Sequence, residues 1–193
     1  LATEQVDADH RQADVAHPCN GVDMAADRMR GRVGARRHIG GEEEGRLPRL
    51  RANVDDGTTT VDTTLNIPGA TPVNPALGVT GAAYTNNDAD PNTATTLFDI
   101  DTTSDQVAIQ APPNAGPLNP TGKLGVDAVG PVGFDIYSEI RSGTTVSVRA
   151  LASIATADGA TSLFRVDLLS GRATHVGTFS VAVVDIAIPT QQR

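Results

Sequence analysis

The chain has 193 residues, enough for one domain with a hydrophobic core, and it carries a net charge of −8. This charge disfavours nucleic acid as a partner, because phosphate binding needs a basic surface. No apolar run approaches the roughly 20 residues that span a bilayer, so we predict no membrane span, and the single cysteine, Cys19, excludes an intrachain disulfide.

The first 49 residues differ in composition from the rest of the chain. They hold eight of the fifteen basic residues and three of the four histidines, and they contain no Phe, Tyr or Trp. Dense charge without hydrophobic periodicity is typical of a segment that cannot bury enough surface to order itself. We therefore predict a poorly structured segment over 1–49, arising from a shifted reading frame or a misassigned start, and a structured domain fragment over 50–193.

From Leu50 onward, apolar residues recur at every second position, which is the period of a strand with one buried face. The alternating sets are Val61, Thr63, Leu65 and Ile67; Phe98 and Ile100; Val107 and Ile109; Val132, Phe134 and Ile136; Val146, Val148, Ala150, Ala152 and Ile154; Phe164, Val166 and Leu168; and Val184, Ile186 and Ile188. Turn dipeptides separate them at Asp56-Gly57, Ser104-Asp105, Ser142-Gly143, Asp158-Gly159 and Ser170-Gly171. The pattern predicts an all-β fold of short antiparallel hairpins.

One hairpin pattern occurs twice. The stretch "TTLFDIDTTSDQ" at 95–106 aligns with "TSLFRVDLLSGR" at 161–172. In both, an aspartate (Asp101 or Asp167) ends the first strand, where its carboxylate can accept a hydrogen bond from the turn backbone two residues on. Hairpins repeated at intervals of tens of residues are typical of propeller blades or a related radial repeat.

An irregular stretch, "IQAPPNAGPLNPTGKLGVD" at 109–127, contains four prolines, which exclude a central strand. Its part "GPLNPTGKL" lacks the glycine spacing and the final Ser or Thr of a phosphate loop, so we predict no nucleotide site there. Long loops in propellers often carry binding. We therefore expect any ligand to bind at 109–127 and at the 84–94 loop, where Tyr84 offers the one aromatic platform.

The segment "NDADPNTATTLFD" at 87–99 has the ligand spacing of an EF-hand calcium loop, in positions 1, 3, 5 and 12 of its window. The four residues are Asp88, Asp90, Asn92 and Asp99. Thr93 stands where the loop needs glycine, and Asp99 already belongs to a predicted strand. We interpret the segment as a polar turn without a metal, with a weak calcium site of another type as the alternative.

Other candidate site residues lack the partner residues that a catalytic or metal site needs. A glycosidase pair could be drawn from Asp99, Asp101, Asp127, Asp135 and Asp167, but each lies beside a turn or strand end, where a structural role is expected. His175 is the histidine of the β region. The sequence has no G-x-S-x-G motif to supply the serine of a Ser-His-Asp site, so we expect a surface or packing role for His175. The remaining set, His10, His17, Cys19 and His38, fits no zinc template. We predict no catalytic, cofactor-binding or metal-binding residue.

Five motifs together resemble the bacterial family called domain of unknown function 4394, over about residues 50–188. They are "AAYTNN" at 82–87, "TTLFDIDTTSD" at 95–105, "IQAPPNAGPL" at 109–118, "LGVDA" at 124–128 and "GFDIY" at 133–137. The resemblance implies an exported β-propeller-type protein, extracellular or periplasmic, in which an "LY-x-ID-x-x-TG" hairpin recurs. Here Leu97-Phe98 and Leu163-Phe164 stand at the start of that hairpin. The family has no established activity, so the resemblance implies no catalytic residue.

We therefore expect a non-enzymatic binding or structural module. Two alternatives stay open: a calcium-stabilised adhesion or polymer-binding module, and a hydrolase with a carboxylate pair. A propeller needs roughly four to eight four-stranded blades, and 50–193 supplies about ten strand candidates. We predict an open, partial propeller that self-associates through exposed strand edges, with Val146–Ile154 and Val181–Ile188 the most exposed.

Overall fold

The computed structural model describes residues 25–27, 32–34, 49–52, 56–69, 74–87 and 93–189. In these ranges every strand pairing within the sheets is antiparallel and no helix is present. The predicted all-β antiparallel class is therefore confirmed. Within the same ranges, no helix has the length and apolar character needed to cross a membrane.

Two four-stranded sheets form the body of the molecule, and each is a meander in which consecutive strands pair. The first has the order β10-β9-β8-β7 and the second the order β11-β12-β13-β14. Their strands are β7 (Val79–Tyr84), β8 (Leu97–Asp101), β9 (Gln106–Gln110) and β10 (Leu118–Lys123), then β11 (Gly133–Arg141), β12 (Thr144–Ala155), β13 (Thr161–Val166) and β14 (Ala173–Thr178). Neither sheet closes on itself, so both are open.

Three two-stranded sheets precede them in the chain. These are β1 (Ala25–Asp27) with β2 (Arg32–Gly34), β3 (Arg49–Ala52) with β4 (Thr59–Asp62), and β5 (Asn66–Ile67) with β6 (Asn74–Pro75). Leu50, where the sequence predicts the boundary, lies within β3 and pairs with Val61 of β4. Most of the segment 1–49 lies outside the described residues, so its lack of structure stays a prediction.

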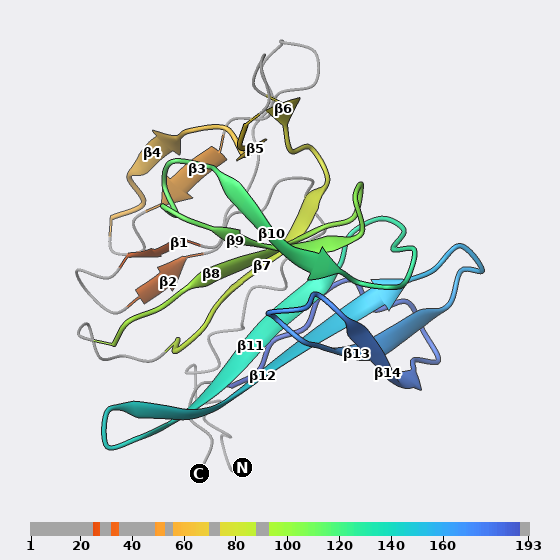
Figure 1. The fold of residues 1–193 in the computed structure, drawn as a ribbon. Helices are drawn as coiled ribbons and strands as arrows, with labels where there is room; N and C mark the ends of the chain where they lie inside the picture. Colours follow the sequence, from red (N-terminus) through yellow and green to blue (C-terminus); the bar gives the residue numbers. More distant parts are fainter. Residues whose placement is uncertain are drawn as a thin grey trace, which may run out of the picture.

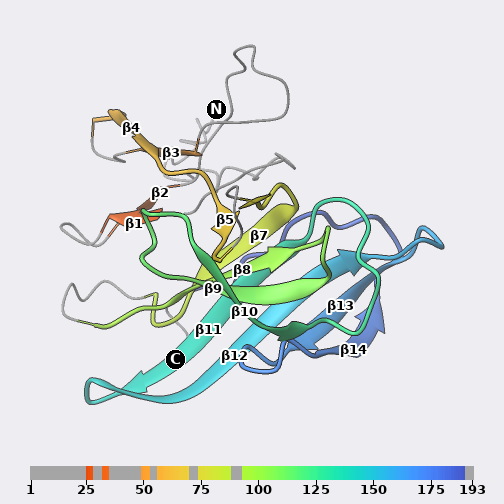
Figure 2. The same ribbon diagram turned by 45° about the horizontal axis from the view of Figure 1, so that its top comes forward.

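The two large sheets pack face to face and share the main hydrophobic core, as two views of the ribbon show (Figure 1, Figure 2). The first sheet supplies Phe98, Ile100 and Val107 to this core, and the second supplies Phe134 and Phe164. On the other face of β8, Leu97 packs with Ala82 and Tyr84 in a smaller cluster. Burial on both faces explains why every residue of β8 is buried, including the polar ones. The predicted alternation in this hairpin is confirmed.

All five predicted turns are present, and each contains a residue with positive φ. Ser142 and Gly143 join β11 to β12 with φ of 50° and 73°, the two-residue geometry that matches strand twist. The left-handed residues of the other turns are Gly57, Asp105, Gly159 and Gly171. Glycine, asparagine and aspartate tolerate this conformation best, which is why the dipeptides could be recognised in the sequence.

Two predicted strands are wrong, one in part and one altogether. The strand expected from Val61 to Ile67 is divided between β4 and β5, because the backbone at 63–66 pairs with the 114–116 loop instead. As a result Val61 is 68% exposed while its neighbour Asp62 is buried. No strand forms over 184–188, where the backbone amide of Ile188 donates to the Asp135 carboxylate rather than to a neighbouring strand.

The predicted exposed edges are also wrong. Val146–Ile154 lies in β12, which is interior to its sheet, between β11 and β13. The edge strands of the two large sheets are β7, β10, β11 and β14. The stretch 109–127, expected to be irregular, contains the last two residues of β9 and the edge strand β10, and its Pro120 adjoins a register shift before Gly122. An edge strand with a bulge is where a proline is tolerated, and the four prolines lie outside the central strands, as predicted.

Candidate functional site

A cleft of about 710 Å³ opens between the two large sheets where the second sheet is left uncovered. Its floor is apolar and consists of Phe98 from β8, Val148 and Ala150 from β12, Val166 from β13, and Leu168. Val148 continues the core-facing side of β12 yet is 43% exposed, because β12 has twelve residues and β7 only six. The cleft has the size and the mixed lining of sites that hold small organic ligands.

The first sheet contributes two threonines to the rim of the cleft. The backbone amide of Thr96 donates to Thr85 Oγ1 at 2.9 Å, and the amide of Thr85 donates to the Thr96 carbonyl at 2.9 Å. The next residue, Asn86, is tied to the long β11–β12 hairpin: its amide donates to Ser138 Oγ at 2.9 Å, and Thr145 Oγ1 lies 2.8 Å from Asn86 Oδ1. These bonds fix the loop that presents Thr85.

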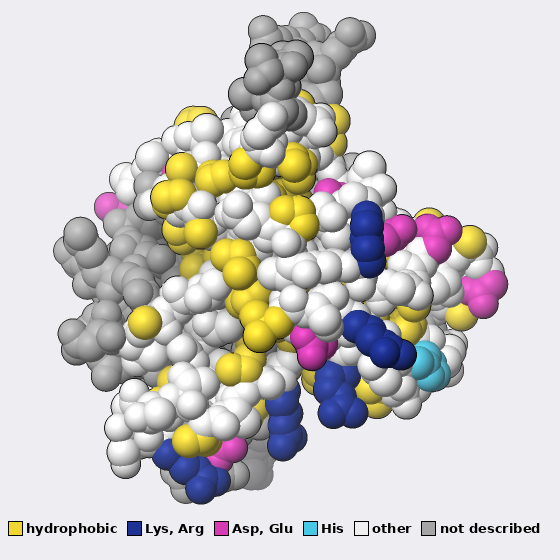
Figure 3. Space-filling view, in the orientation of Figure 1, with side chains coloured by type: hydrophobic (Ala, Val, Ile, Leu, Met, Phe, Trp, Pro, Cys, Tyr) yellow, Lys and Arg dark blue, Asp and Glu magenta, His cyan; other side chains and the backbone are white. Residues whose placement is uncertain are grey.

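The opposite rim belongs to the β13–β14 hairpin, where Arg165, Arg172 and Thr174 are among the lining residues. Arg165 pairs with Thr174 across the two strands, and the amide of Asp167 donates to the Arg172 carbonyl at 2.9 Å. The flanking residues Phe164, Val166 and Ala173 face the core, so the side chains of Arg165 and Thr174 lie on the other face of the sheet. Figure 3 shows basic side chains over β12, β13 and β14.

The turn of this hairpin is held by Asp167. Its Oδ1 accepts from the amides of Leu169 at 3.0 Å and Ser170 at 2.9 Å, as the sequence predicts for an aspartate at a strand end. Hydrogen bonding from Ser170, and then from Leu169, holds the pKa of the Asp167 carboxyl below its ordinary value. Asp167 is thus an ionised acceptor at neutral pH, suited to capping the turn rather than to donating a proton.

The same turn is braced by the first sheet. A Cβ on Gly122 of β10 would lie 1.9 Å from the carbonyl oxygen of Ser170, and a Cβ on Gly171 would lie 2.2 Å from the carbonyl oxygen of Gly122. The amide of Ala173 donates to the Leu124 carbonyl at 2.8 Å. Two backbones approach this closely only where both residues lack a side chain. The hairpin rim therefore rests on a fixed support.

The other candidate carboxylates do not join Asp167. Asp101 caps the first hairpin turn, Asp99 is buried in the middle of β8, and Asp127 is exposed. Asp135 accepts from the amides of Ile136 and Ile188, and burial raises its pKa, with Asp185 adding repulsion. Among the residues that the structure describes, no three metal-ligating side chains cluster.

The calcium-like window is described only in part. Asp88, Asp90 and Asn92 lie outside the described residues, so the predicted absence of a metal there stays a prediction. Asp99, the last residue of the window, is in β8 as predicted, where it pairs with Ala82 and Ala108.

His175 has the packing role expected of it. Its ring meets Phe164 edge to face, with centroids 5.5 Å apart, and its Nε2 lies 3.2 Å from Thr178 Oγ1. The segment that resembles a phosphate loop forms β10, and its Lys123 donates through Nζ to the Ser104 carbonyl. The remaining candidates His10, His17, Cys19 and His38 lie outside the described residues.

Of the two loops expected to bind a ligand, one contributes to the cleft. Thr85 comes from the 84–94 loop, whereas no residue of 109–127 lines the cleft. The two arginines were missed by the sequence reasoning, although a signal was present. In the aligned hairpins, Arg165 stands where the first has Asp99, and Arg172 stands where it has Gln106. The repeat thus changes charge at the two positions that border the cleft.

No curated protein and no solved structure matches the chain significantly. The family model described as domain of unknown function (DUF4394) matches residues 43–187, about three quarters of the chain. This match includes the two large sheets, the shared core and the cleft. The chain therefore belongs to the DUF4394 family.

Proposed function

We propose that this chain is a non-enzymatic, exported domain of the β-propeller type that binds a small ligand in the cleft between its two large sheets. The observation that carries the proposal is the cleft itself, with its volume of about 710 Å³, its apolar floor and its polar rim. Export, to an extracellular or periplasmic location, rests on the family resemblance.

The propeller-type arrangement is supported by the order of the strands. Two consecutive four-stranded meanders pack face to face, which is how neighbouring blades meet in a propeller. The aligned hairpins also share one register: Phe98 pairs with Ile109, and Phe164, at the matching position, pairs with His175. Two such sheets correspond to two blades of a larger ring.

A binding role without catalysis is supported by the chemistry of the rim. Asp167 is the one carboxylate that lines the cleft among the described residues. Its lowered pKa makes it a poor proton donor, and the turn amides of Leu169 and Ser170 already occupy its Oδ1. Hydrolysis by a carboxylate pair needs a second acid beside it.

A fragment screen tests this function. A mixture of acidic, neutral and basic fragments is added to the chain, and ligand-observed NMR detects those that bind. Val148→Trp fills the cleft floor, while Val176→Trp, at a 55% exposed valine of β14 outside the cleft, serves as the control. We expect hits that Val148→Trp removes and Val176→Trp retains. If no hit depends on Val148, or if a hydrolase panel shows turnover, the proposed function is wrong.

We further propose that the chain self-associates through the open edge of β14. Strand β14 pairs with β13 on one side only, and it presents Val176 to solvent. An unpaired edge is a template for a strand of a second copy, and lysine on such an edge prevents that pairing. We expect sedimentation velocity to show concentration-dependent association that Val176→Lys reduces. A monomer at every concentration would contradict this proposal.

A further inference from the structure

The floor of the cleft continues the hydrophobic core that the two large sheets share. Ala150 pairs with Ile136 on one side and with Val166 on the other, and all three are core residues. Side chains alternate along a strand, so Val148 lies on the same face of β12 as Ala150. Leu168 packs against the same core. The floor is therefore an apolar surface that the first sheet leaves uncovered.

The charged residues that border the cleft occupy positions on the other face of the second sheet. Arg165 precedes the core residue Val166, so alternation directs it away from the floor. The amide of Asp167 donates to the Arg172 carbonyl, which extends the pairing of β13 with β14 by one residue. Asp167 and Arg172 thus take the same side as Arg165. Among the lining residues, those at core-facing positions are all uncharged.

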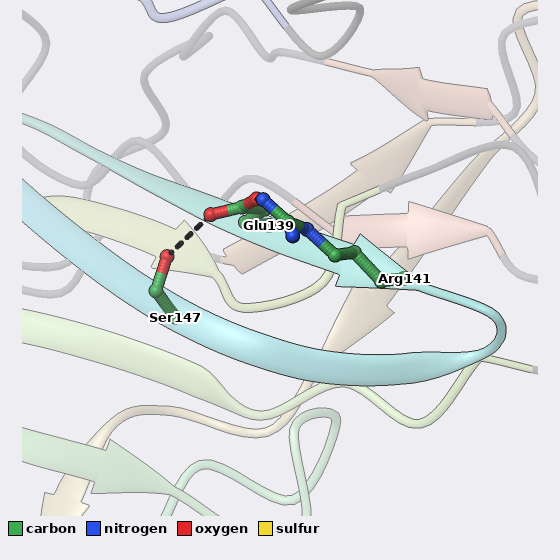
Figure 4. Close-up of polar contacts among 3 residues, drawn as sticks. All are labelled: Glu139, Arg141 and Ser147. Atoms are coloured by element: carbon green, nitrogen blue, oxygen red, sulfur yellow. Dashed lines mark hydrogen bonds and ion pairs between the residues drawn. The ribbon is translucent and has the colours of Figure 1, made fainter.

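The long β11–β12 hairpin shows the same division. Glu139 pairs with Ser147, which adjoins Val148, so both side chains lie on the face away from the floor. On that face Arg141 Nε donates to Glu139 Oε1 at 2.8 Å, and Ser147 Oγ lies 3.2 Å from Glu139 Oε2 (Figure 4). The carboxylate of Glu139 is therefore engaged there and adds no charge to the cleft.

Two hydroxyl groups of the first sheet do face the cleft. Ala83 pairs with Phe98 in the shared core, and Thr85 and Thr96 come two residues from them on the same face. Thr85 Oγ1 accepts from the Thr96 amide at 2.9 Å, whereas Thr96 Oγ1 has no hydrogen-bond partner among the described residues. Thr96 is exposed, so its hydroxyl group can donate to a ligand at the mouth of the cleft.

This arrangement favours a neutral ligand over an ion. Val148 is 43% exposed, and a ligand that covers it removes apolar surface from water, which is favourable. A carboxylate or ammonium group drawn onto the same floor would lose hydration without gaining an opposite charge. A neutral hydrogen-bond acceptor loses less, because the Thr96 hydroxyl group replaces its water.

We infer that the cleft binds a neutral organic molecule with an apolar body and one hydrogen-bond acceptor. The body lies on Phe98 and Val148, and the acceptor takes a hydrogen bond from Thr96 Oγ1. The inference rests on the proposed binding function and names the ligand class of that cleft. A volume of about 710 Å³ is ample for a molecule with one ring and a short chain.

Titration of the full chain with three probes that share a phenylalkyl body tests this inference. They are 4-phenyl-2-butanone, which is neutral, 4-phenylbutyrate, which is an anion, and 4-phenylbutylammonium, which is a cation at neutral pH. Dissociation constants come from ligand-observed NMR at one fixed salt concentration. We expect the ketone to bind about tenfold or more tightly than either ion, because the ions lose hydration that the floor does not replace.

One hydroxyl group distinguishes the acceptor contact from apolar burial alone. Thr96→Val keeps the shape of the side chain and removes the hydroxyl group, so it should weaken ketone binding about fivefold. Thr60→Val is the matched control, at an exposed threonine of β4 that does not line the cleft, and it should leave the ketone affinity unchanged. A melting curve for each variant verifies folding.

The outcomes separate this inference from the proposed function. If an ion binds as tightly as the ketone, the neutral-ligand inference is wrong, and the binding function stands where Val148→Trp abolishes that binding. If Thr96→Val and Thr60→Val bind the ketone alike, the assigned acceptor contact is wrong and the inference fails. If no probe binds, the inference is overturned, and the fragment screen alone decides the function.

Discussion

The hairpins β8–β9 and β13–β14 share a sequence pattern and a register, yet they occupy different environments. In the first, Asp101 is 4% exposed and accepts from the amide of Thr103 at 2.9 Å and from Ser104 Oγ at 2.7 Å. In the second, Asp167 accepts from the amides of the two matching residues, Leu169 and Ser170, while exposed on the rim of the cleft. An aspartate thus caps the turn from a buried position in one sheet and from an exposed position in the other.

Each turn also rests on a glycine from a different strand or connection. A Cβ on Gly78 would meet the side chains of Thr103 and Asp101, at 2.1 and 2.3 Å. A Cβ on Gly122 would meet the backbone of Ser170. A side chain can change rotamer and give way, whereas a hydrogen-bonded turn backbone cannot. The second turn is therefore the more rigidly supported of the two.

The largest effect should come from Gly122→Ala. The added methyl group would overlap the Ser170 carbonyl, and relief requires β10 and the turn to separate. We expect a loss of about 3 kcal/mol in the free energy of unfolding, measured in urea. The control is Gly125→Ala, which has φ of 75° with open space around it and should cost only about 1 kcal/mol. Equal losses would mean that the close contact does not support the turn.

The next effect compares the two caps directly. Asp101→Ala removes two hydrogen bonds from a buried carboxylate, so we expect a loss of about 2 kcal/mol. Asp167→Ala removes its two bonds where water can replace them, and it should cost clearly less than Asp101→Ala. Urea unfolding of both variants decides the matter. If Asp167→Ala costs as much as Asp101→Ala, burial does not distinguish the hairpins.

A smaller effect should appear in the pH dependence of stability. The pKa of Asp167 is lowered in the folded chain, so its contribution is present above the ordinary value of 3.8 and is lost as the pH falls through the folded pKa. The pKa of Asp135 is raised, chiefly by burial, so the folded state holds that proton more tightly and stability falls as the pH rises above 3.8.

Matched asparagine variants test these opposite signs. Compared with wild type, Asp135→Asn should gain stability as the pH rises from about 3.5 to 6.5, and Asp167→Asn should lose it over the acidic part of that range. Melting temperatures at closely spaced pH values give the comparison. Parallel pH curves for wild type and both variants would contradict the assigned shifts.

No effect is expected from calcium, which tests the loop ahead of the first hairpin. Specific binding at ten times the dissociation constant would add about 1.4 kcal/mol of stability. We expect unchanged melting at millimolar calcium, in the wild type and in Asp88→Ala with Asp90→Ala. An upward shift that these substitutions abolish would establish a calcium site there.

The sequence predicts what local chemistry controls. Turn dipeptides with positive φ, the alternation around Phe98 and Phe164, and the caps at Asp101 and Asp167 were all recognisable, because each depends on neighbouring residues. Val61 was misjudged because a distant loop, 114–116, takes the backbone partners of the residues after it. Pairing partners far along the chain leave no periodic signal.

The cleft could not be predicted, because it depends on how far one sheet extends past the other. Val148 continues the core-facing alternation of β12. It lines the floor of the cleft because the shorter strands β7 and β8 do not cover it. Arg165 and Arg172 could be found only by comparing the aligned hairpins at Asp99 and Gln106. The comparison of the two hairpins shows a change of charge, but it does not show that these residues line a cleft.

Amide chemical shifts of the ¹⁵N-labelled chain during titration with a fragment found in the screen test the central claim most directly. The account predicts saturable shifts at Thr85, Thr96, Val148 and Leu168, around the cleft, and none at the 156–160 turn, which joins the other ends of β12 and β13. The same titration of the Val148→Trp variant should give much smaller shifts. Shifts centred on the 156–160 turn, or a pattern unchanged in Val148→Trp, would contradict the claim that the cleft binds a small ligand.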